Sequence, residues 1–337
     1  MITKAILLAG GRGSRLFPLT ESIPKPLLPI DNIPALSRIF RNLERTGIRH
    51  ATVTLGYLGD KIAARYGGIF RTLHLEYSRE EKPLGTAGAV KAAALMSNEE
   101  ALPAFARNEK TEDAYLVLSG DALFEGDLSE LIETHNRRRA DVTIAAKEVG
   151  DVTGYGVILG KPSRIESFLE KPDPSTAPSH LVNTGIYVLS RRVLEEIPAG
   201  PYDFGRELFP ALLRKGYTLC YHVYDDYWCD IGTPESFLSC NLRYSEGKTV
   251  LGNACRLAPT AKTRKSVFFD HVTLGDRSFA ENSVLCEGVT LGEGVSVLSC
   301  VVGAGCELKV SPPPGSLVWS EGGKLALRPL ETAVLPI

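Results

Sequence analysis

Apolar runs alternate with segments of helical periodicity through the first part of the chain. Residues 5–9 (AILLA) have the pattern of a buried strand, and residues 34–46 carry apolar side chains at helical spacing. Strand-like runs return at 51–55 and near 73–77, with a second helix expected over 59–66. This alternation predicts an α/β fold, a doubly wound and mostly parallel Rossmann-like sheet whose ligand lies at the carboxyl ends of the strands.

A different pattern begins near Val250, where short apolar residues recur beside glycines at a spacing near six residues. This spacing is typical of a left-handed parallel β-helix, which we expect over residues 250–315. The preceding α/β domain is predicted over 1–246, and residues 316–337 are predicted to form a C-terminal tail. About three coils fit into the repeat region, and so short a solenoid needs a neighbour to cover its ends. We therefore expect a homo-oligomer formed through the β-helix.

Composition and charge exclude several classes of protein. The 337 residues are 44% hydrophobic and 23% charged, as in an ordinary globular protein. A formal net charge of -2 gives no basic excess, so we expect no nucleic-acid partner. We find neither a signal-peptide pattern nor an apolar run of about 18 residues, and we expect a cytoplasmic protein without a membrane partner. The seven cysteines form no C-x-x-C pair, which favours reduced thiols over a zinc site or a disulfide framework.

A glycine-rich loop follows the first strand. Closely spaced glycines let backbone N–H groups approach a phosphate, and this loop is neither a P-loop nor a G-x-G-x-x-G fingerprint. Lys25, between Pro24 and Pro26, adds a positive charge on a stiff backbone. The loop residues that we expect to contact a nucleotide are Leu8, Ala9, Gly10, Gly11, Gly13, Ser14 and Arg15.

Residues 9–29, AGGRGSRLFPLTESIPKPLLP, closely resemble the signature of the nucleoside-diphosphate-sugar pyrophosphorylases, which are sugar-1-phosphate nucleotidyltransferases. The resemblance implies a reaction in which a sugar 1-phosphate attacks the α-phosphate of a nucleoside triphosphate and releases pyrophosphate. It also implies that residues 1–246 are a nucleotidyltransferase catalytic domain, with Arg15 and Lys25 as catalytic cations.

The resemblance assigns the segment PLGTAG, with Gly85 and Thr86, to the pocket of the nucleotide base. Glu80 and Glu81 stand just before it. A carboxylate only accepts hydrogen bonds, which matches the N1–H and N2 amino donors of guanine, whereas a glutamine would suit uracil or thymine. The pair therefore favours GTP as the nucleotide.

Two acidic residues are candidate ligands of Mg²⁺. Asp121 ends an apolar strand expected over 114–121, where a carboxylate would either bind Mg²⁺ or cap the next helix. The resemblance makes Asp121 the first metal ligand and puts Gly120 at the nucleotide. It makes Asp230, in the segment YWCDIGTP, the second metal ligand. Thr233 and Pro234 read as the N-cap and first residue of a helix.

The middle of the chain resembles the sugar-binding half of the same family through its GYG, EKP and NTGIY elements. Lys171 is expected to hold the phosphate of the sugar, while Glu170 and Asn183 bind sugar hydroxyls. Residues 202–210 read as the start of a core helix without a catalytic role. The full set of predicted sugar-phosphate ligands is Gly156, Glu170, Lys171, Asn183, Thr184 and Gly185.

Within the family, several motifs look most like those of bacterial mannose-1-phosphate guanylyltransferases, which implies GDP-mannose formation from GTP and mannose 1-phosphate. Two alternatives remain: a glucose-1-phosphate thymidylyl-, uridylyl- or adenylyltransferase, and a non-catalytic regulatory paralogue. The charged residues that such paralogues usually lose are all present, namely Arg15, Lys25, Asp121, Lys171 and Asp230. No side-chain nucleophile is required, because a sugar phosphate is largely a dianion at neutral pH.

Overall fold

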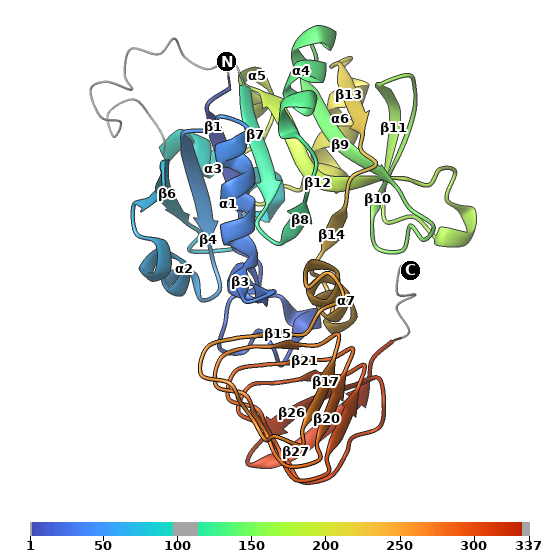
Figure 1. Cartoon of the computed structure of the whole chain (residues 1–337). Coiled ribbons are helices and arrows are strands. Elements are labelled where there is room, and N and C mark those ends of the chain that lie inside the picture. The colour runs from blue at the N-terminus through green and yellow to red at the C-terminus, as the bar shows by residue number, and fades with distance from the viewer. Residues whose placement is uncertain (1, 97–113, 332–337) are drawn as a thin grey trace. The chain divides into compact units, whose positions relative to one another are not determined.

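The computed structural model describes residues 2–96 and 114–331, which form two compact units (Figure 1). Unit 1 consists of Met1–Arg12 and Leu36–Trp228, and unit 2 of Gly13–Ala35 and Cys229–Ile337. The domain boundaries that we expect from the sequence pattern stay predictions. The two units are defined instead by contacts within the structure, and these contacts group the segment after the glycine loop with the C-terminal part of the chain. Over the described ranges, no helix combines the length and apolar character needed to cross a membrane.

Unit 1 is built on one ten-stranded sheet. In spatial order its strands are β10 (Gly156–Lys161), β11 (Arg164–Glu170), β13 (Leu219–Val223), β9 (Val142–Glu148), β12 (Leu181–Ser190), β7 (Ala114–Ser119), β1 (Lys4–Leu8), β4 (His50–Leu55), β6 (Leu73–Arg79) and β5 (Ile69–Phe70).

The sheet is parallel where the glycine loop leaves it. β1 runs parallel to β4 and β7, and β4 runs parallel to β6, so these four strands end at one edge. β12 is antiparallel to both β7 and β9, which makes β9 parallel to β7 again. The α/β fold predicted from the alternation of strands and helices is confirmed, and the glycine loop lies at the carboxyl end of β1.

Helices cover both faces of this sheet (Figure 1). One face packs against helices α3 (Gly85–Met96) and α6 (Phe209–Arg214) in a core that includes Ile6, Val90, Val117 and Phe209. The other face carries α1 (Ala35–Arg45) and α4 (Leu128–Arg138). Two shorter helices are α2 (Gly59–Tyr66) and α5 (Arg191–Glu195). β1 therefore needs apolar side chains on both faces, which explains its uninterrupted apolar run.

The N-terminal segment of unit 2 has little regular structure. It contains two single turns of 3₁₀-helix, Ser14–Leu16 and Lys25–Leu27, and the short pair β2 (Pro29–Ile30) and β3 (Ile33–Pro34). The backbone N–H of Asp31 donates to Oδ1 of Asn241, at 2.9 Å, on helix α7 (Pro234–Tyr244). This bond ties the segment to the C-terminal part of the same unit.

Helix α7 begins as the sequence predicts. Thr233 is its N-cap, and the side chain accepts a hydrogen bond from the backbone of Ser236, which reciprocates in a capping box. Pro234 occupies the first helical position, where its missing N–H has no cost. The short strand β14 (Trp228–Asp230) precedes the cap, so the capped turn fixes the backbone just after Asp230.

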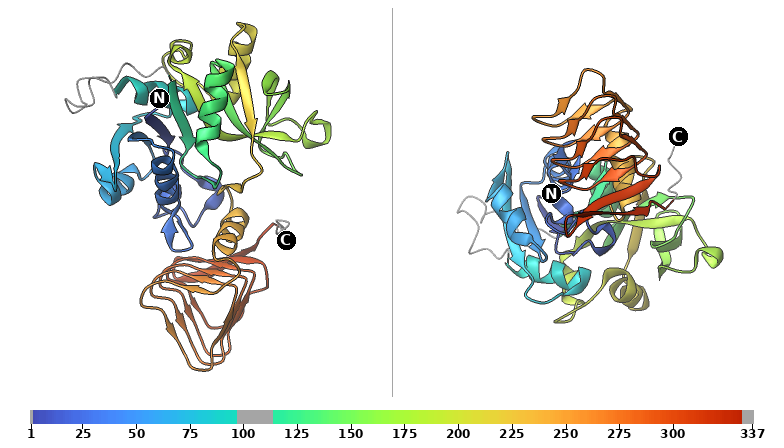
Figure 2. Two further views of the ribbon diagram at one scale, coloured as in Figure 1. Left: turned by 45° about the horizontal axis from the view of Figure 1, so that its top comes forward. Right: turned by 90° about the horizontal axis from the view of Figure 1, so that it is seen from below.

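The C-terminal part of unit 2 is a parallel β-helix, which confirms the fold predicted from the repeat (Figure 2). Partners in successive coils lie 17 residues apart, as Val250, Val267, Val284 and Val301 do. Buried side chains such as Phe268 and Leu285 fill the interior. The strands of the three faces are β15 (Val250–Leu251), β18 (Val267–Phe268), β21 (Val284–Leu285) and β24 (Val301–Val302); β16 (Arg256–Leu257), β19 (Thr273–Leu274), β22 (Thr290–Leu291) and β25 (Glu307–Leu308); and β17 (Lys262–Arg264), β20 (Phe279–Glu281) and β23 (Ser296–Leu298).

Much of the predicted C-terminal tail is part of this fold. β26 (Ser316–Glu321) adds a parallel rung to β24, and β27 (Lys324–Pro329) folds back antiparallel to β26. The turn between them contains Gly322 and Gly323, both at positive φ. Strand β27 thus covers the edge of β26, the last parallel strand on this face of the solenoid. Residues 332–337 of the predicted tail lie outside the described residues.

Candidate functional site

Unit 1 gathers predicted nucleotide residues where β1, β6 and β7 end. The backbone N–H of Gly120, after β7, donates to the carbonyl of Leu8 at 2.8 Å. A Cβ atom placed on Gly10 would lie 2.7 Å from Oε1 of Glu80, at the end of β6. Ala9 donates its backbone N–H to Thr54 Oγ1 at 3.3 Å. The fold therefore brings together residues that are up to 112 positions apart in sequence, as the parallel topology predicts.

The two predicted base-reading glutamates differ in their surroundings. Glu80 is partly buried and its Oε2 accepts a hydrogen bond from the backbone N–H of Leu84 at 3.0 Å, so its carboxylate is held in place. Glu81 is exposed. Of the pair, Glu80 lies beside the glycine loop.

Thr86 makes a contact that the sequence did not predict. Its hydroxyl donates to Oδ2 of Asp203 at 2.9 Å and accepts the backbone N–H of Phe204 at 2.9 Å. Asp203 also caps a π-helical turn, Phe204–Leu208, through the backbone N–H groups of Gly205 and Arg206. Asp203 thus connects the start of α3 to the elements that carry the predicted sugar site.

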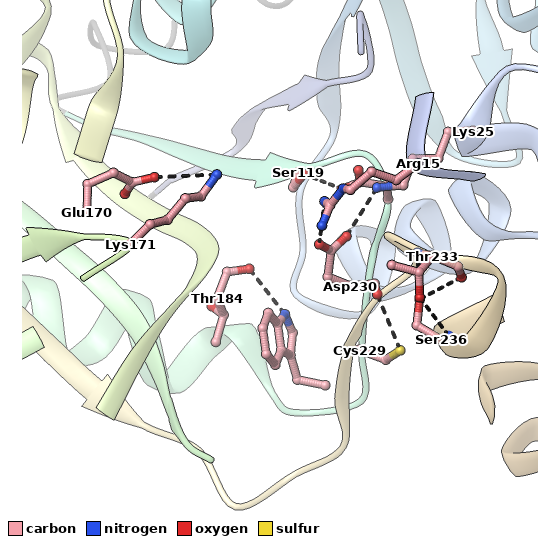
Figure 3. Close-up of polar contacts among 12 residues, drawn as sticks. Arg15, Lys25, Ser119, Glu170, Lys171, Thr184, Cys229, Asp230, Thr233 and Ser236 are labelled. Carbon is pink, nitrogen blue, oxygen red and sulfur yellow. Dashed lines mark hydrogen bonds and ion pairs between the residues drawn. The ribbon is translucent and has the colours of Figure 1, made fainter. Parts of the chain in front are cut away.

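Two of the predicted sugar residues, Gly156 and Lys171, lie beside Glu170. Its Oε1 lies 3.8 Å from Nζ of Lys171 (Figure 3). The Lys171 side chain is exposed. A Cβ atom on Gly205 would lie only 2.2 Å from Oε2 of Glu170, so a larger residue here would displace the Glu170 carboxylate. Burial raises the pKa of Glu170; Lys171 opposes that shift and Asp203 adds to it.

The other predicted sugar residues divide into two kinds. Asn183 donates to the hydroxyl of Tyr187 at 2.9 Å and accepts the backbone N–H of Gly185 at 2.9 Å, so its amide orientation is fixed. Thr184 is buried, and its hydroxyl donates to the carbonyl of Ala145 at 2.7 Å. The Thr184 side chain therefore links neighbouring strands of the sheet. Gly156 is buried at the start of β10.

Asp121 follows β7 at the carboxyl edge of the sheet. The hydroxyl of Ser119 donates to its Oδ1, and the residue is partly exposed. In unit 1 the carboxylate is thus oriented by Ser119, the last residue of β7, and stays accessible.

Unit 2 brings together three of the five predicted charged residues. Lys25 Nζ lies 3.2 Å from Oδ1 of Asp230, and Arg15 Nη2 lies 4.0 Å from Oδ2 of the same carboxylate (Figure 3). The Lys25 side chain is 10% exposed and that of Asp230 29% exposed, while the Arg15 side chain is 68% exposed. Both cations can bind the oxygens of a polyphosphate.

The local backbone explains why this cluster forms. Pro24 caps the 3₁₀ turn that begins at Lys25, and Pro26 follows inside it, so the lysine starts from a stiff backbone. The turn at Arg15 begins after Gly13, which has a positive φ of 63°. A Cβ atom on Gly232 would lie 3.1 Å from both Arg15 Nη2 and Asp230 Oδ2, a close approach that the sequence did not predict.

Comparison with known proteins identifies the family of the chain. Residues 4–247 match the family described as nucleotidyl transferase. A mannose-1-phosphate guanylyltransferase from Mycobacterium tuberculosis is 37% identical over 238 residues, covering 69% of this chain and 62% of that protein. A D-glycero-alpha-D-manno-heptose 1-phosphate guanylyltransferase from Aneurinibacillus thermoaerophilus is 32% identical over 237 residues, covering 69% of this chain and 95% of that protein. The crystal structure of HddC from Yersinia pseudotuberculosis complexed with GMP-PN is 26% identical, with a TM-score of 0.59, covering 72% of this chain and 100% of that one.

Proposed function

The chain belongs to the nucleotidyl transferase family. On that premise we propose that it transfers the nucleoside monophosphate group of a nucleoside triphosphate to a sugar 1-phosphate. An oxygen of the sugar phosphate attacks the α-phosphorus of the triphosphate. The bond from that phosphorus to the oxygen bridging to the β-phosphate breaks, and pyrophosphate leaves. The observation that carries this proposal is the convergence of Lys25 and Arg15 on Asp230.

The proposed chemistry needs charge neutralisation rather than an activated side chain. The second pKa of a phosphate monoester is about 6, so the attacking group is already largely a dianion at neutral pH. The barrier then lies in bringing it to a negatively charged triphosphate. Arg15 and Lys25 supply positive charge for the triphosphate, the backbone of the glycine loop supplies N–H donors, and Lys171 holds the sugar phosphate.

We propose Mg²⁺ as the cofactor, with Asp121 and Asp230 as its protein ligands. Their carboxylate oxygens suit this hard cation. Over residues 2–96 and 114–331, no group of three or more His, Cys, Asp and Glu side chains could hold a metal ion. We propose that the remaining ligands of the ion are substrate phosphates and water. When bound, Mg²⁺ would neutralise phosphate charge.

The substrates that we favour are GTP and mannose 1-phosphate, giving GDP-mannose. Glu80, an acceptor beside the glycine loop, supports guanine. The names of the Mycobacterium and Aneurinibacillus relatives also include guanylyl transfer. We further propose that Glu170 and Asn183 bind sugar hydroxyls, since the Glu170 carboxylate lies beside Lys171 and the Asn183 amide has a fixed orientation.

We also propose a cytoplasmic homo-oligomer assembled through the β-helix. The seven cysteines are free thiols, which suits a reducing compartment. On the terminal hairpin, Leu325 and Leu327 are 43% and 51% exposed, and a second copy could cover them.

The test is a matrix of pyrophosphate-release assays with and without Mg²⁺. It crosses GTP, ATP, UTP, CTP and dTTP with mannose 1-phosphate and glucose 1-phosphate. A maximum for GTP with mannose 1-phosphate is expected. A maximum with another pair would keep the reaction and discard the base and sugar assignment. If none of these substrate pairs gives pyrophosphate release, the result would favour the non-catalytic paralogue.

A further inference from the structure

An open cavity of about 610 Å³ lies in unit 1 between the end of α4 and the start of α5. Small-molecule sites usually have volumes of roughly 300–1,000 Å³. Three arginines line it, together with two acidic residues and a histidine, namely Arg139, Arg191, Arg192, Asp141, Glu195 and His135. None of these six residues belongs to the candidate functional site.

The cavity is at the opposite edge of the sheet from the glycine loop. Ser190, which lines it, pairs with Ala114 at the first position of β7. Asp121 follows the last residue of that strand, Ser119. Five residue steps along a strand span about 17 Å. A ligand in this cavity would therefore not overlap one at the carboxyl edge.

The floor of the cavity is rigid. Asp141 is 1% exposed; it accepts the guanidinium of Arg192 and, at 2.8 Å, the backbone N–H of Thr218. His135 is also buried, between the hydroxyls of Thr143 and Ser190. Asp141 neutralises Arg192, yet the Arg192 side chain is 63% exposed, so part of its guanidinium still faces solvent. The network holds one guanidinium in a fixed place at the rim.

The other two arginines have no such structural use. Arg139 and Arg191 are exposed, and neither pairs with an acid in the part of the chain that the structure describes. Arg139 closes α4 with φ of 47°, in the left-handed region where glycine is the favoured residue. With Asp141 paired to Arg192, Glu195 balances only one of these two charges. The cavity therefore keeps an excess of positive charge.

We propose that this cavity binds a phosphate monoester, with its phosphate dianion held by Arg139, Arg191 and the anchored Arg192. Guanidinium groups offer forked N–H donors that match phosphate oxygens, and several of them suit a dianion better than a single carboxylate. The bound ester would occupy a second site, separate from the proposed reaction.

The test is isothermal titration calorimetry on the full chain with two probes, phenyl phosphate and inorganic phosphate. The parent protein carries Lys25→Ala and Lys171→Ala, which weaken phosphate binding at the proposed active site. In this background, Arg139→Gln/Arg191→Gln is compared with the matched control Arg137→Gln/Arg138→Gln. The control removes the same number of positive charges, both from the last turn of α4, but leaves the cavity lining intact.

We expect phenyl phosphate to bind the parent protein. Its Kd should rise on the order of tenfold in the cavity variant and less than about twofold in the control. An absence of binding to the parent, or an equal loss in both variants, would contradict the site. An unchanged Kd in the cavity variant would do the same. Binding of inorganic phosphate alone would overturn the assignment of an ester. None of these results depends on catalysis.

Discussion

Lys25 and Asp230 lie 205 residues apart in the sequence, yet Nζ of the lysine is 3.2 Å from Oδ1 of the aspartate. The pair joins the segment after the glycine loop to the turn that begins α7, within one compact unit. Because the Lys25 side chain is 10% exposed, its charge needs a partner in the absence of a substrate. A bound triphosphate would take over that role.

Replacing Lys25 by alanine should reduce turnover with little loss of fold. Loss of one preorganised charge at a reacting phosphate usually costs roughly 10²–10³ in rate. Asp230 keeps Arg15 at 4.0 Å and some exposure to water, so its carboxylate is not stranded. The measurement is pyrophosphate release together with a thermal unfolding curve.

The matched control for that variant is Lys248→Ala, which removes an exposed lysine paired with Glu246 at 2.9 Å. It should leave turnover unchanged. Comparable turnover in both variants would refute the role of Lys25.

Gly232→Ala should lower activity without a large change in stability. The new Cβ atom would lie 3.1 Å from Arg15 Nη2 and Asp230 Oδ2, which are the ends of flexible side chains. These groups can move by a few tenths of an ångström, so the cost falls on their position rather than on packing. Gly68→Ala is the control, because no atom lies within 4 Å of its added Cβ. Equal activity of the two variants would show that the cluster tolerates displacement.

Glu170→Gln should stabilise the protein at neutral pH while weakening sugar binding. Burial, together with Asp203, raises the pKa of Glu170 above its ordinary value of 4.5. The folded state then binds a proton more tightly than the unfolded state, so ionisation lowers stability as pH rises above that value. The variant should gain melting temperature at pH 7 and little at pH 4, and raise KM for the sugar phosphate. A lower melting temperature at pH 7 than wild type would contradict this reasoning.

His135 should make the protein sensitive to acid. Burial lowers the pKa of His135 to about 4, with Asp141 opposing the shift. Between pH 6.5 and 4 the unfolded state binds more protons, so stability rises with pH across that window. From pH 6.5 to pH 5 this residue accounts for about 2 kcal/mol of lost stability. The free energy of unfolding, measured with urea, should therefore fall less steeply with decreasing pH in His135→Gln than in the wild type. Equal slopes in the two proteins would argue against a buried neutral imidazole.

Local sequence patterns predicted most of the fold. The apolar run of β1 and the cap at Thr233 are each encoded within a few residues, and the solenoid follows from apolar residues that recur beside glycines at near six-residue spacing. The hairpin β26–β27 was missed because Pro312–Pro314 suggested that the repeat had ended. In the structure those prolines lie outside the strands, where their missing N–H groups do not break a ladder.

The candidate site was less accessible from the sequence. Family motifs suggested Lys25 and Asp230 separately as site residues, but their pairing was not predicted, since no local pattern relates residues so far apart. Asp203 was assigned to a core helix, and its bond to Thr86 depends on tertiary packing across 117 residues. The close approaches at Gly205 and Gly232 likewise appear only once the chain is folded.

The most direct test of the account is whether the protein releases pyrophosphate from GTP in a way that requires mannose 1-phosphate. The assay follows pyrophosphate and nucleotide sugar together, with Mg²⁺ present. The account predicts equal amounts of both products and no release when the sugar phosphate is omitted. Pyrophosphate release without sugar phosphate, or nucleotide sugar without pyrophosphate, would contradict it.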